Sequence, residues 1–206
     1  MPGGFTIIVL LPLVGFLLSR YSPRWLLFFG LIVLSGSLFH MAGFDLDMDF
    51  RTAAVARMFQ AAGMAFLFVP INTAAYAFLP RDKNNAASGL MNLARNIGGS
   101  VGISLVTTML DRRSQVHLND LSRNLSSSNP ALRSLIQGAT RAMQSHGSSA
   151  ALATKQAYAL VQGTLQRQAT MLAYIDDFRF LGVAILLMVP LVFLMKKGKP
   201  GAVVVH

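Results

Sequence analysis

The sequence predicts an all-α membrane protein, a polytopic bundle of five transmembrane helices with one long, partly helical loop on the outer side. Composition is the first reason: 53% of the residues are hydrophobic and only 13% are charged, whereas soluble domains average about 25% charged residues. The second reason is that apolar residues gather in segments near the length of about 20 residues that a helix needs to cross a bilayer. The predicted spans are residues 4–19, 25–43, 53–79, 87–110 and 178–195.

The residue types argue against several other classes of protein. The chain has no cysteine, which excludes disulfides and thiolate metal sites, and we predict neither a metal nor a cofactor. The net charge of +10 would suit a nucleic-acid-binding protein, but such proteins carry their basic residues on a solvated face beside stacking aromatic residues. Here the basic residues lie between apolar segments, so the expected partner is a lipid bilayer and not nucleic acid.

The distribution of Lys and Arg predicts the orientation of the spans. Cytoplasmic loops are enriched in these residues, and three short segments are basic: residues 20–24, 81–83 and 196–199. With five spans, all three segments lie on one side of the membrane. The C-terminus is therefore predicted to be cytoplasmic, and residues 44–51, which contain three aspartates, are predicted to lie outside.

The chain is predicted to divide into three parts. Residues 1–110 form a four-span membrane segment, residues 111–173 form an outer loop, and residues 174–206 hold the last span and a basic tail. The loop is basic, but loops longer than about 60 residues are translocated largely regardless of charge. We interpret it as a cover for the outer mouth of the bundle or as a segment that lies along the lipid headgroups.

Helices are expected within this outer loop. One helix should follow Pro130, and "SHGSS" at residues 145–149 should break the chain. An amphipathic helix should then run toward the last span. The loop contains no acid–base pair, nucleophile arrangement or glycine-rich phosphate loop, so we do not expect an enzyme. The apolar residues at helical spacing in the second helix are Leu152, Tyr158, Val161, Leu165 and Met171.

The third span carries a polar face. Arg57, Gln60 and Gly63 follow one another at intervals of three residues, which places them on one drifting side of a helix. A charged side chain deep in the membrane costs at least about 2.5 kcal/mol, so it usually faces the bundle interior or a wet cavity. Gly63 would let a neighbouring helix approach closely. Two interpretations of Arg57 are open: it lines a polar pathway, or it snorkels to the outer interface. Near Pro70 we expect a bend, with polar groups such as Asn72 satisfying the freed backbone.

The fourth span shows the same combination. Asn92, Arg95 and Asn96 form a polar stripe at intervals of three and four residues. Gly98 and Gly102 belong to a second, small-residue face that suits helix packing. One face would meet a partner helix and the other a polar pathway, as a transporter requires, although a purely structural hydrogen-bond cluster explains the stripe equally well.

Asp176 stands directly before the last span. A carboxylate at this depth could act as a proton relay, or it could be an acidic residue at the start of an interfacial helix. Its spacing of three residues from Arg179 would permit an ion pair.

Four stretches together resemble a known family. "GFLLSRYSPRW" (15–25), "RMFQAAGMAFLFVP" (57–70), "AASGLMNLARNIGGSVGIS" (86–104) and "QATMLAYIDDF" (168–178) occur in this order. They resemble the C-terminal part of the fourteen-span drug/proton antiporters of the major facilitator superfamily, the EmrB/QacA type. The resemblance implies that the five spans are the last five of fourteen, in the C-terminal half of the fold. It also identifies Gly15, Arg20 and Arg24 with a cytoplasmic loop motif, in which Ser19 replaces the usual Asp.

The resemblance implies a part of a proton-coupled multidrug exporter in a bacterial cytoplasmic (inner) membrane. Such transporters rock two halves against each other, and the spans of the first half are not in this sequence. We therefore expect the chain, as a fragment or the product of a truncated gene, to be inactive alone. The implied partners are the N-terminal half or another copy, a periplasmic adaptor protein and a small lipophilic substrate. The implied pathway candidates are Arg57, Gln60, Asn92, Arg95, Asn96 and Asp176.

Two alternatives from other classes remain open at this point. The chain could be a non-transporting membrane subunit with an assembly or regulatory role, which uses its basic outer loop to bind a partner. It could also be a degraded remnant of a transporter.

Overall fold

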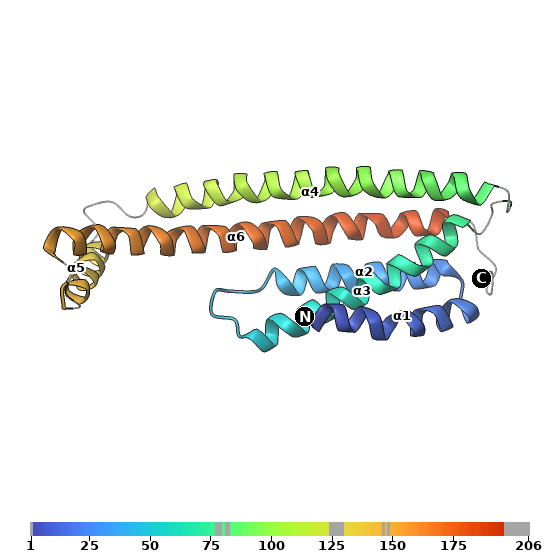
Figure 1. Cartoon of the computed structure of the whole chain (residues 1–206), viewed down its shortest axis with the longest axis horizontal. Coiled ribbons are helices and arrows are strands. Elements are labelled where there is room, and N and C mark those ends of the chain that lie inside the picture. The colour runs from blue at the N-terminus through green and yellow to red at the C-terminus, as the bar shows by residue number, and fades with distance from the viewer. Residues whose placement is uncertain are drawn as a thin grey trace. The chain divides into compact units, whose positions relative to one another are not determined.

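The computed structural model describes residues 2–76, 80, 83–123, 130–145, 147 and 149–195, and this part of the chain is all-α, as predicted. Each helix is continuous in the ribbon view (Figure 1). Parts of the predicted basic segments 81–83 and 196–199 lie outside the described residues. The helices are α1 (Pro2–Arg20), α2 (Pro23–Met41), α3 (Phe50–Tyr76), α4 (Asn84–Arg123), α5 (Pro130–Ser145) and α6 (Ala150–Leu194).

Four of the described helices are long and apolar enough to cross a membrane: α1, α2, α3 and α6. The predicted fourth span, residues 87–110, is helical within α4, but α4 does not belong to this group. Its polar stripe and its glycines lower its hydropathy. The prediction of five spans therefore exceeds by one the number that length and composition support in the described residues.

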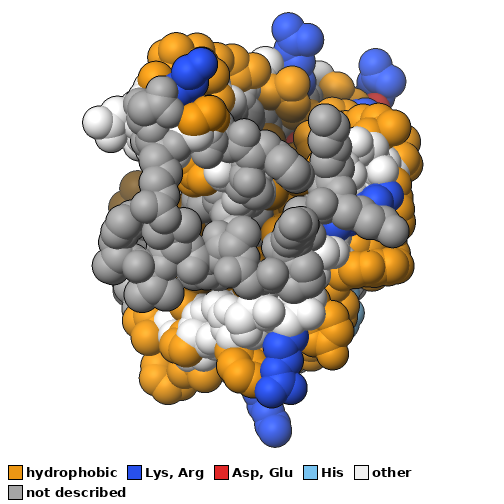
Figure 2. All heavy atoms as spheres, turned by 90° about the vertical axis from the view of Figure 1, so that its right-hand side faces the viewer, with side chains coloured by type: hydrophobic (Ala, Val, Ile, Leu, Met, Phe, Trp, Pro, Cys, Tyr) orange, Lys and Arg blue, Asp and Glu red, His pale blue; other side chains and the backbone are white. Residues whose placement is uncertain are grey.

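Large apolar side chains remain exposed along the helices, as expected for surfaces in contact with lipid. Phe5 and Ile8 of α1 are each 69% exposed, and Leu187 of α6 is 71% exposed. Figure 2 shows hydrophobic side chains over much of the surface in that view, with Lys and Arg side chains projecting from it.

The chain divides into two compact units. The first unit comprises residues 1–104 and 177–206, and the second comprises residues 105–176. The predicted outer loop, residues 111–173, lies within the second unit. The predicted loop boundaries fall inside α4 and α6, because both helices continue past them: with 40 and 45 residues, they are about 60 and 68 Å long. A bilayer core is about 30 Å thick.

Close helix contacts organise the first unit, in which α3 packs against α1 and α2. Gly63 of α3 lies close to α2, since a Cβ atom there would lie 2.8 Å from the backbone nitrogen of Leu34. Gly30 of α2 faces α3 in the same way, with Phe66 Cβ 3.0 Å from the position of an added Cβ. Two clusters of buried apolar residues lie in this unit. The first contains Val14, Leu18, Leu26 and Phe66, and the second contains Leu27, Leu31 and Val192.

Two polar side chains donate to the backbone of α3 next to Pro70, while the predicted bend at this residue stays a prediction. Proline cannot donate a backbone hydrogen bond, and its ring crowds the preceding turn. Asn72 Nδ2 donates to the carbonyl of Phe68 at 2.8 Å, and Thr73 Oγ1 donates to that of Val69 at 3.1 Å. These side chains supply extra donors next to the interruption.

The second unit contains α5 and the adjoining parts of α4 and α6. The helix predicted after Pro130 is present as α5, and the predicted break before α6 contains Gly147, whose φ of 93° favours glycine.

The buried face of α6 within the second unit is lined by small residues. It follows every fourth residue, with Ala153, Ala157, Ala169 and Ala173 fully buried and Val161 and Leu165 half-buried between them. This is the i±4 ridge along which helices commonly pack. Leu152 and Tyr158, two of the apolar residues at helical spacing, are 50% and 58% exposed and lie outside this buried face.

Candidate functional site

Arg57 and Gln60 lie one helical turn apart on α3 and are joined, because Arg57 Nη1 donates to Gln60 Oε1. The spacing of these two residues in the sequence predicted only that they lie on one side of the helix. Arg57 remains exposed in this chain, so the guanidinium keeps donors for other partners. Its role in a transport pathway stays a prediction.

Arg95 joins α4 to α3 inside the first unit. Its Nη2 donates to Asn72 Oδ1 at 3.1 Å, and its guanidinium carbon lies 5.2 Å from the centre of the Phe68 ring. A cation over an aromatic ring gains about 0.5–1 kcal/mol at an exposed site. Asn72 is itself oriented by its bond to the Phe68 carbonyl. The result is a positive charge held against α3 by a neutral amide and an aromatic face.

Sequence reasoning missed the partner of Arg95. It grouped Arg95 with Asn92 and Asn96, its neighbours on the same helix, whereas the acceptor is Asn72 on α3. A signal did exist: an arginine within an apolar helix requires an acceptor, and Asn72 is the amide that follows Pro70 in the preceding span.

The small-residue face of α4 is open in this chain. Among the described residues, no atom outside the local backbone lies within 4 Å of a Cβ atom built on Gly98 or Gly102. Asn92 and Asn96 are exposed as well. Their roles in packing and in a pathway stay predictions that require a partner for this face.

The predicted cytoplasmic loop motif connects α2 to the end of α6 within the first unit. Arg24 Nη2 donates to the carbonyl of Phe193, and the guanidinium lies 4.9 Å from the centre of the Phe193 ring. Phe193 is the next-to-last residue of α6, so Arg24 caps a helix C-terminus, where a positive charge is favourable. Arg20 lies 4.9 Å from the centre of the Phe16 ring, one turn earlier on α1. In the described part of the chain, no atom outside the local backbone lies within 4 Å of a Cβ atom built on Gly15.

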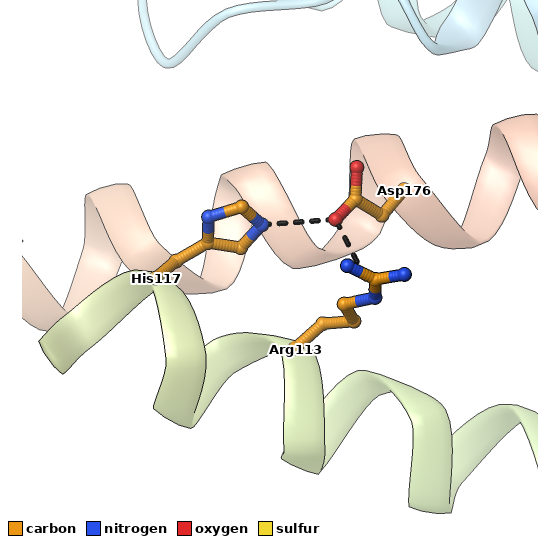
Figure 3. Close-up of polar contacts among 3 residues, drawn as sticks. All are labelled: Arg113, His117 and Asp176. Atoms are coloured by element: carbon orange, nitrogen blue, oxygen red, sulfur yellow. Dashed lines mark hydrogen bonds and ion pairs between the residues drawn. The ribbon is translucent and has the colours of Figure 1, made fainter. Parts of the chain in front are cut away.

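Asp176 lies in a charged cluster within the second unit (Figure 3). His117 Nε2 of α4 is 2.9 Å from Asp176 Oδ2 of α6, and Arg113 Nε of α4 is 3.8 Å from the same oxygen. The side chains of His117 and Asp176 are each only 24% exposed. Nearby, Ser114 and Thr170 link the same two helices, with 3.4 Å between their hydroxyl oxygens.

Two expectations about Asp176 are wrong. It does not stand at the start of a helix, because α6 begins at Ala150 and runs through it without interruption. Its ion pairs in the described part of the chain are with Arg113 and His117, and not with Arg179. The physical reason is that α4 brings two basic side chains to the carboxylate. The signal in the sequence was the spacing of four residues between Arg113 and His117, which places both on one face of α4.

Within the described residues, no group of three His, Asp or Glu side chains is placed to hold a metal ion. The polar groups of these contacts can hold charge, accept protons and connect helices.

Comparison with known proteins places these features in a family. A model of the Major Facilitator Superfamily matches residues 3–114, more than half of the chain. The multidrug export protein EmrB of Escherichia coli (strain K12) is 30% identical over 141 residues, which cover 66% of this chain and 28% of that protein. The uncharacterized MFS-type transporter YhcA of Bacillus subtilis (strain 168) is 27% identical over 139 residues, or 68% of this chain and 26% of that protein.

A longer match covers almost the whole chain. The colistin resistance protein EmrB of Acinetobacter baumannii is 23% identical over 199 residues, which cover 97% of this chain and 38% of that protein. The chain therefore spans between about a quarter and two fifths of the length of these three relatives. The resemblance to EmrB-type exporters is confirmed, and with its apolar helices and the matched family model the chain belongs to the major facilitator superfamily.

Proposed function

We propose that this chain supplies the last five membrane helices of a proton-coupled exporter of lipophilic compounds. The observation that carries this proposal is the match of residues 3–114 to the superfamily, together with relatives whose names include multidrug export. Each of these relatives is longer than the chain, so the remaining helices would come from an N-terminal half or from another copy. The exporter would reside in a bacterial cytoplasmic membrane with its C-terminus in the cytoplasm. A periplasmic adaptor protein is a further proposed partner, and it rests on the family resemblance alone.

The contact between Arg95 and Asn72 supports a role of α3 and α4 in transport. Alternating access requires groups of helices that move together as rigid bodies. Arg95 fastens α4 to α3 through a hydrogen bond and a contact with Phe68. We infer that Arg95 is a positioning residue that keeps the two helices together as the transporter changes state. Asn92, Asn96, Arg57 and Gln60 would contribute polar groups to the pathway.

Dye efflux from cells that lack their own exporters tests the proposal. The chain should be produced alone and also fused behind the first nine spans of a full-length relative. The chain alone should give no efflux of a lipophilic dye, and the fused protein should give efflux that an uncoupler abolishes. Uncoupler-sensitive efflux by the chain alone would show that it is complete, and an inactive fused protein at normal membrane levels would contradict transport.

Chemical labelling tests the proposed orientation. The natural chain has no cysteine, so a single Ser149→Cys substitution before α6 provides a unique thiol. An impermeant maleimide should label it on intact cells, whereas a tag after the C-terminus should react only in opened cells. Labelling of Ser149→Cys only after permeabilisation would reverse the orientation.

A further inference from the structure

The cluster of Arg113, His117 and Asp176 has no function in the role proposed above for α3 and α4. Both basic groups come from α4 and meet one carboxylate oxygen of α6. In Figure 3 one ring nitrogen of His117 points toward Asp176 and the other points away. Since Nε2 makes the contact at 2.9 Å, the nitrogen that points away is Nδ1. No other described residue forms a hydrogen bond or ion pair with His117.

This arrangement leaves one basic nitrogen available. In the neutral tautomer that suits the contact, the Nε2–H group donates to Asp176 Oδ2 and Nδ1 carries a lone pair. Histidine is the side chain whose charge ordinarily changes between about pH 5 and 8. A proton that adds to Nδ1 therefore need not break the bond to Asp176.

Two charges near the His117 ring act on a bound proton in opposite directions. The carboxylate of Asp176 on α6 stabilises a positive ring, while Arg113 on α4, 3.8 Å from the same oxygen, competes for that negative charge. These are the charged groups that contact the cluster in the described residues, and none comes from α5. With neutral His117 the cluster has no net charge, and one added proton makes it singly positive.

We propose that His117 and Asp176 form a proton-binding site, in which the proton from water adds to Nδ1 of His117 and Arg113 limits its affinity. The resulting imidazolium keeps its Nε2–H bond to the carboxylate, and the two partners now carry opposite charges, which adds an electrostatic attraction to the bond. Loss of the proton to water returns the neutral ring. Proton binding thus strengthens the connection between α4 and α6 within the second unit.

This site extends the proposed function, because it names where a proton binds in the exporter. The proposed coupling of the bound proton to export rests on the proposed function, whereas proton binding itself does not. In the proposed orientation Arg113 and His117 lie in the outer loop and Asp176 directly before the last span, on the side from which protons enter during proton-coupled export.

Nitrogen NMR of the full chain in lipid nanodiscs, with ¹⁵N-labelled histidine, measures the protonation of His117 directly. The variant His117→Gln identifies its signals. In Asp176→Asn, an isosteric amide can still accept from Nε2–H but carries no charge, so the proton affinity of His117 should fall by about tenfold or more. Arg113→Gln should raise this affinity, and Arg113→Lys, which keeps the charge, should change it less.

Matched controls separate the site from general effects. Arg112→Gln removes the same charge from the adjacent residue, and it should change the affinity of His117 less than Arg113→Gln does. His40 should titrate identically in all variants. Equal titration of His117 in the natural chain and in Asp176→Asn, with helicity retained, would overturn the proposal, as would a neutral ring that carries its proton on Nδ1 and not on Nε2. If Asp176→Asn does not fold, Asp176→Glu should keep His117 within about tenfold of its natural affinity, and a larger loss would count against the site.

Transport by the fused exporter distinguishes this proposal from the proposed function. If His117 titrates as described but the fused exporter is inactive, the proton-binding site stands and the transport function fails. If the exporter is active and Asp176→Asn leaves the titration of His117 unchanged, the site fails and the transport function stands.

Discussion

The two units of this chain hold their arginines in different ways. In the first unit, Arg57 and Arg95 donate to neutral side-chain amides and Arg24 donates to a main-chain carbonyl. In the second unit, Arg113 and His117 meet a carboxylate. A neutral acceptor fixes an arginine without cancelling its charge, and the contact does not change with protonation near neutral pH. A carboxylate next to a histidine cancels charge and responds to protons.

The units also differ in how their helices approach one another. The first unit uses Gly30 and Gly63, where an added Cβ atom would crowd the facing helix. The second unit buries Ala153, Ala157, Ala169 and Ala173 along one ridge of α6. The comparison indicates that small residues permit close helix contacts in both units, glycines in the first and alanines in the second.

The largest effect is expected from removing Arg95, whose positive charge is held in the first unit by a neutral amide. In the fused exporter, Arg95→Ala should lower uncoupler-sensitive dye efflux by about tenfold, because a hydrogen bond of a charged group contributes about 1.5–3 kcal/mol. Arg95→Lys should restore most of the efflux, since the contact with Asn72 is a single hydrogen bond and not a bidentate one.

A matched substitution controls for this loss. Arg51→Ala removes an exposed arginine near the start of α3 and should leave efflux nearly unchanged. Membrane levels of every variant should be measured in parallel. Natural efflux from Arg95→Ala would show that this neutral contact has no role in transport.

The next effect concerns packing. Gly63→Ala places a methyl group 2.8 Å from the backbone of Leu34, and overpacking of this kind costs about 1–3 kcal/mol. Thermal unfolding of the chain in detergent should show a lower midpoint for Gly63→Ala. Gly98→Ala, where a Cβ meets open space, should be neutral or slightly stabilising, because alanine has the higher helix propensity.

The Gly98→Ala variant also tests the predicted packing face of α4. In the fused exporter, a loss of efflux for Gly98→Ala would indicate that another helix covers this face when the transporter is complete. If Gly98→Ala is harmless in both proteins, the packing role predicted for Gly98 is contradicted.

Exchanging one amide for a carboxylate should make the first unit resemble the second. In Asn72→Asp, the acceptor of Arg95 becomes a carboxylate at the same place, so the contact becomes a charge-neutralising ion pair. Dye efflux should then fall by several-fold at every pH at which the cells survive, because an opposite charge in contact keeps a carboxylate ionised. Natural efflux from Asn72→Asp would show that the charge of Arg95 is unimportant.

The smallest effect is expected at Asp49, a carboxylate of the first unit that lies outside the predicted spans. It precedes α3 and accepts from the backbone nitrogen of Thr52 at 3.1 Å. Hydrogen bonds from the side chain and the backbone of Thr52 hold the pKa of Asp49 below its ordinary value. Its contribution to the start of α3 is therefore complete above the pKa of the unfolded chain, and is lost as the pH falls through the lower, folded value.

Amide hydrogen exchange at Thr52 measures this contribution. At neutral pH, Asp49→Ala should speed exchange at Thr52 a few-fold and leave the rest of α3 unchanged, because the residue at this position caps only the first turn. Asp45→Ala is the control, since Asp45 bonds to Asp47 and not to α3. Equal protection of Thr52 in both variants would contradict a capping role.

The sequence by itself determined features that lie within one helix or one turn. The apolar segments predicted helices at α1, α2, α3 and α6, because lipid contact requires a minimum length of apolar residues. The spacing of Arg57 and Gln60 predicted their common face, since helical periodicity fixes which residues lie above one another. Pro130 and Gly147 marked the start of α5 and the break before α6, because their backbone preferences act locally.

Only the tertiary structure decided which faces meet. Asn72 lies 23 residues before its partner Arg95, and His117 lies 59 residues before Asp176, so helical periodicity carries no information about either contact. The burial of the alanine ridge of α6, in place of Leu152 and Tyr158, has the same origin. A helix buries the face along which a neighbour can approach most closely, and small side chains permit this approach even where larger apolar residues stand elsewhere on the helix.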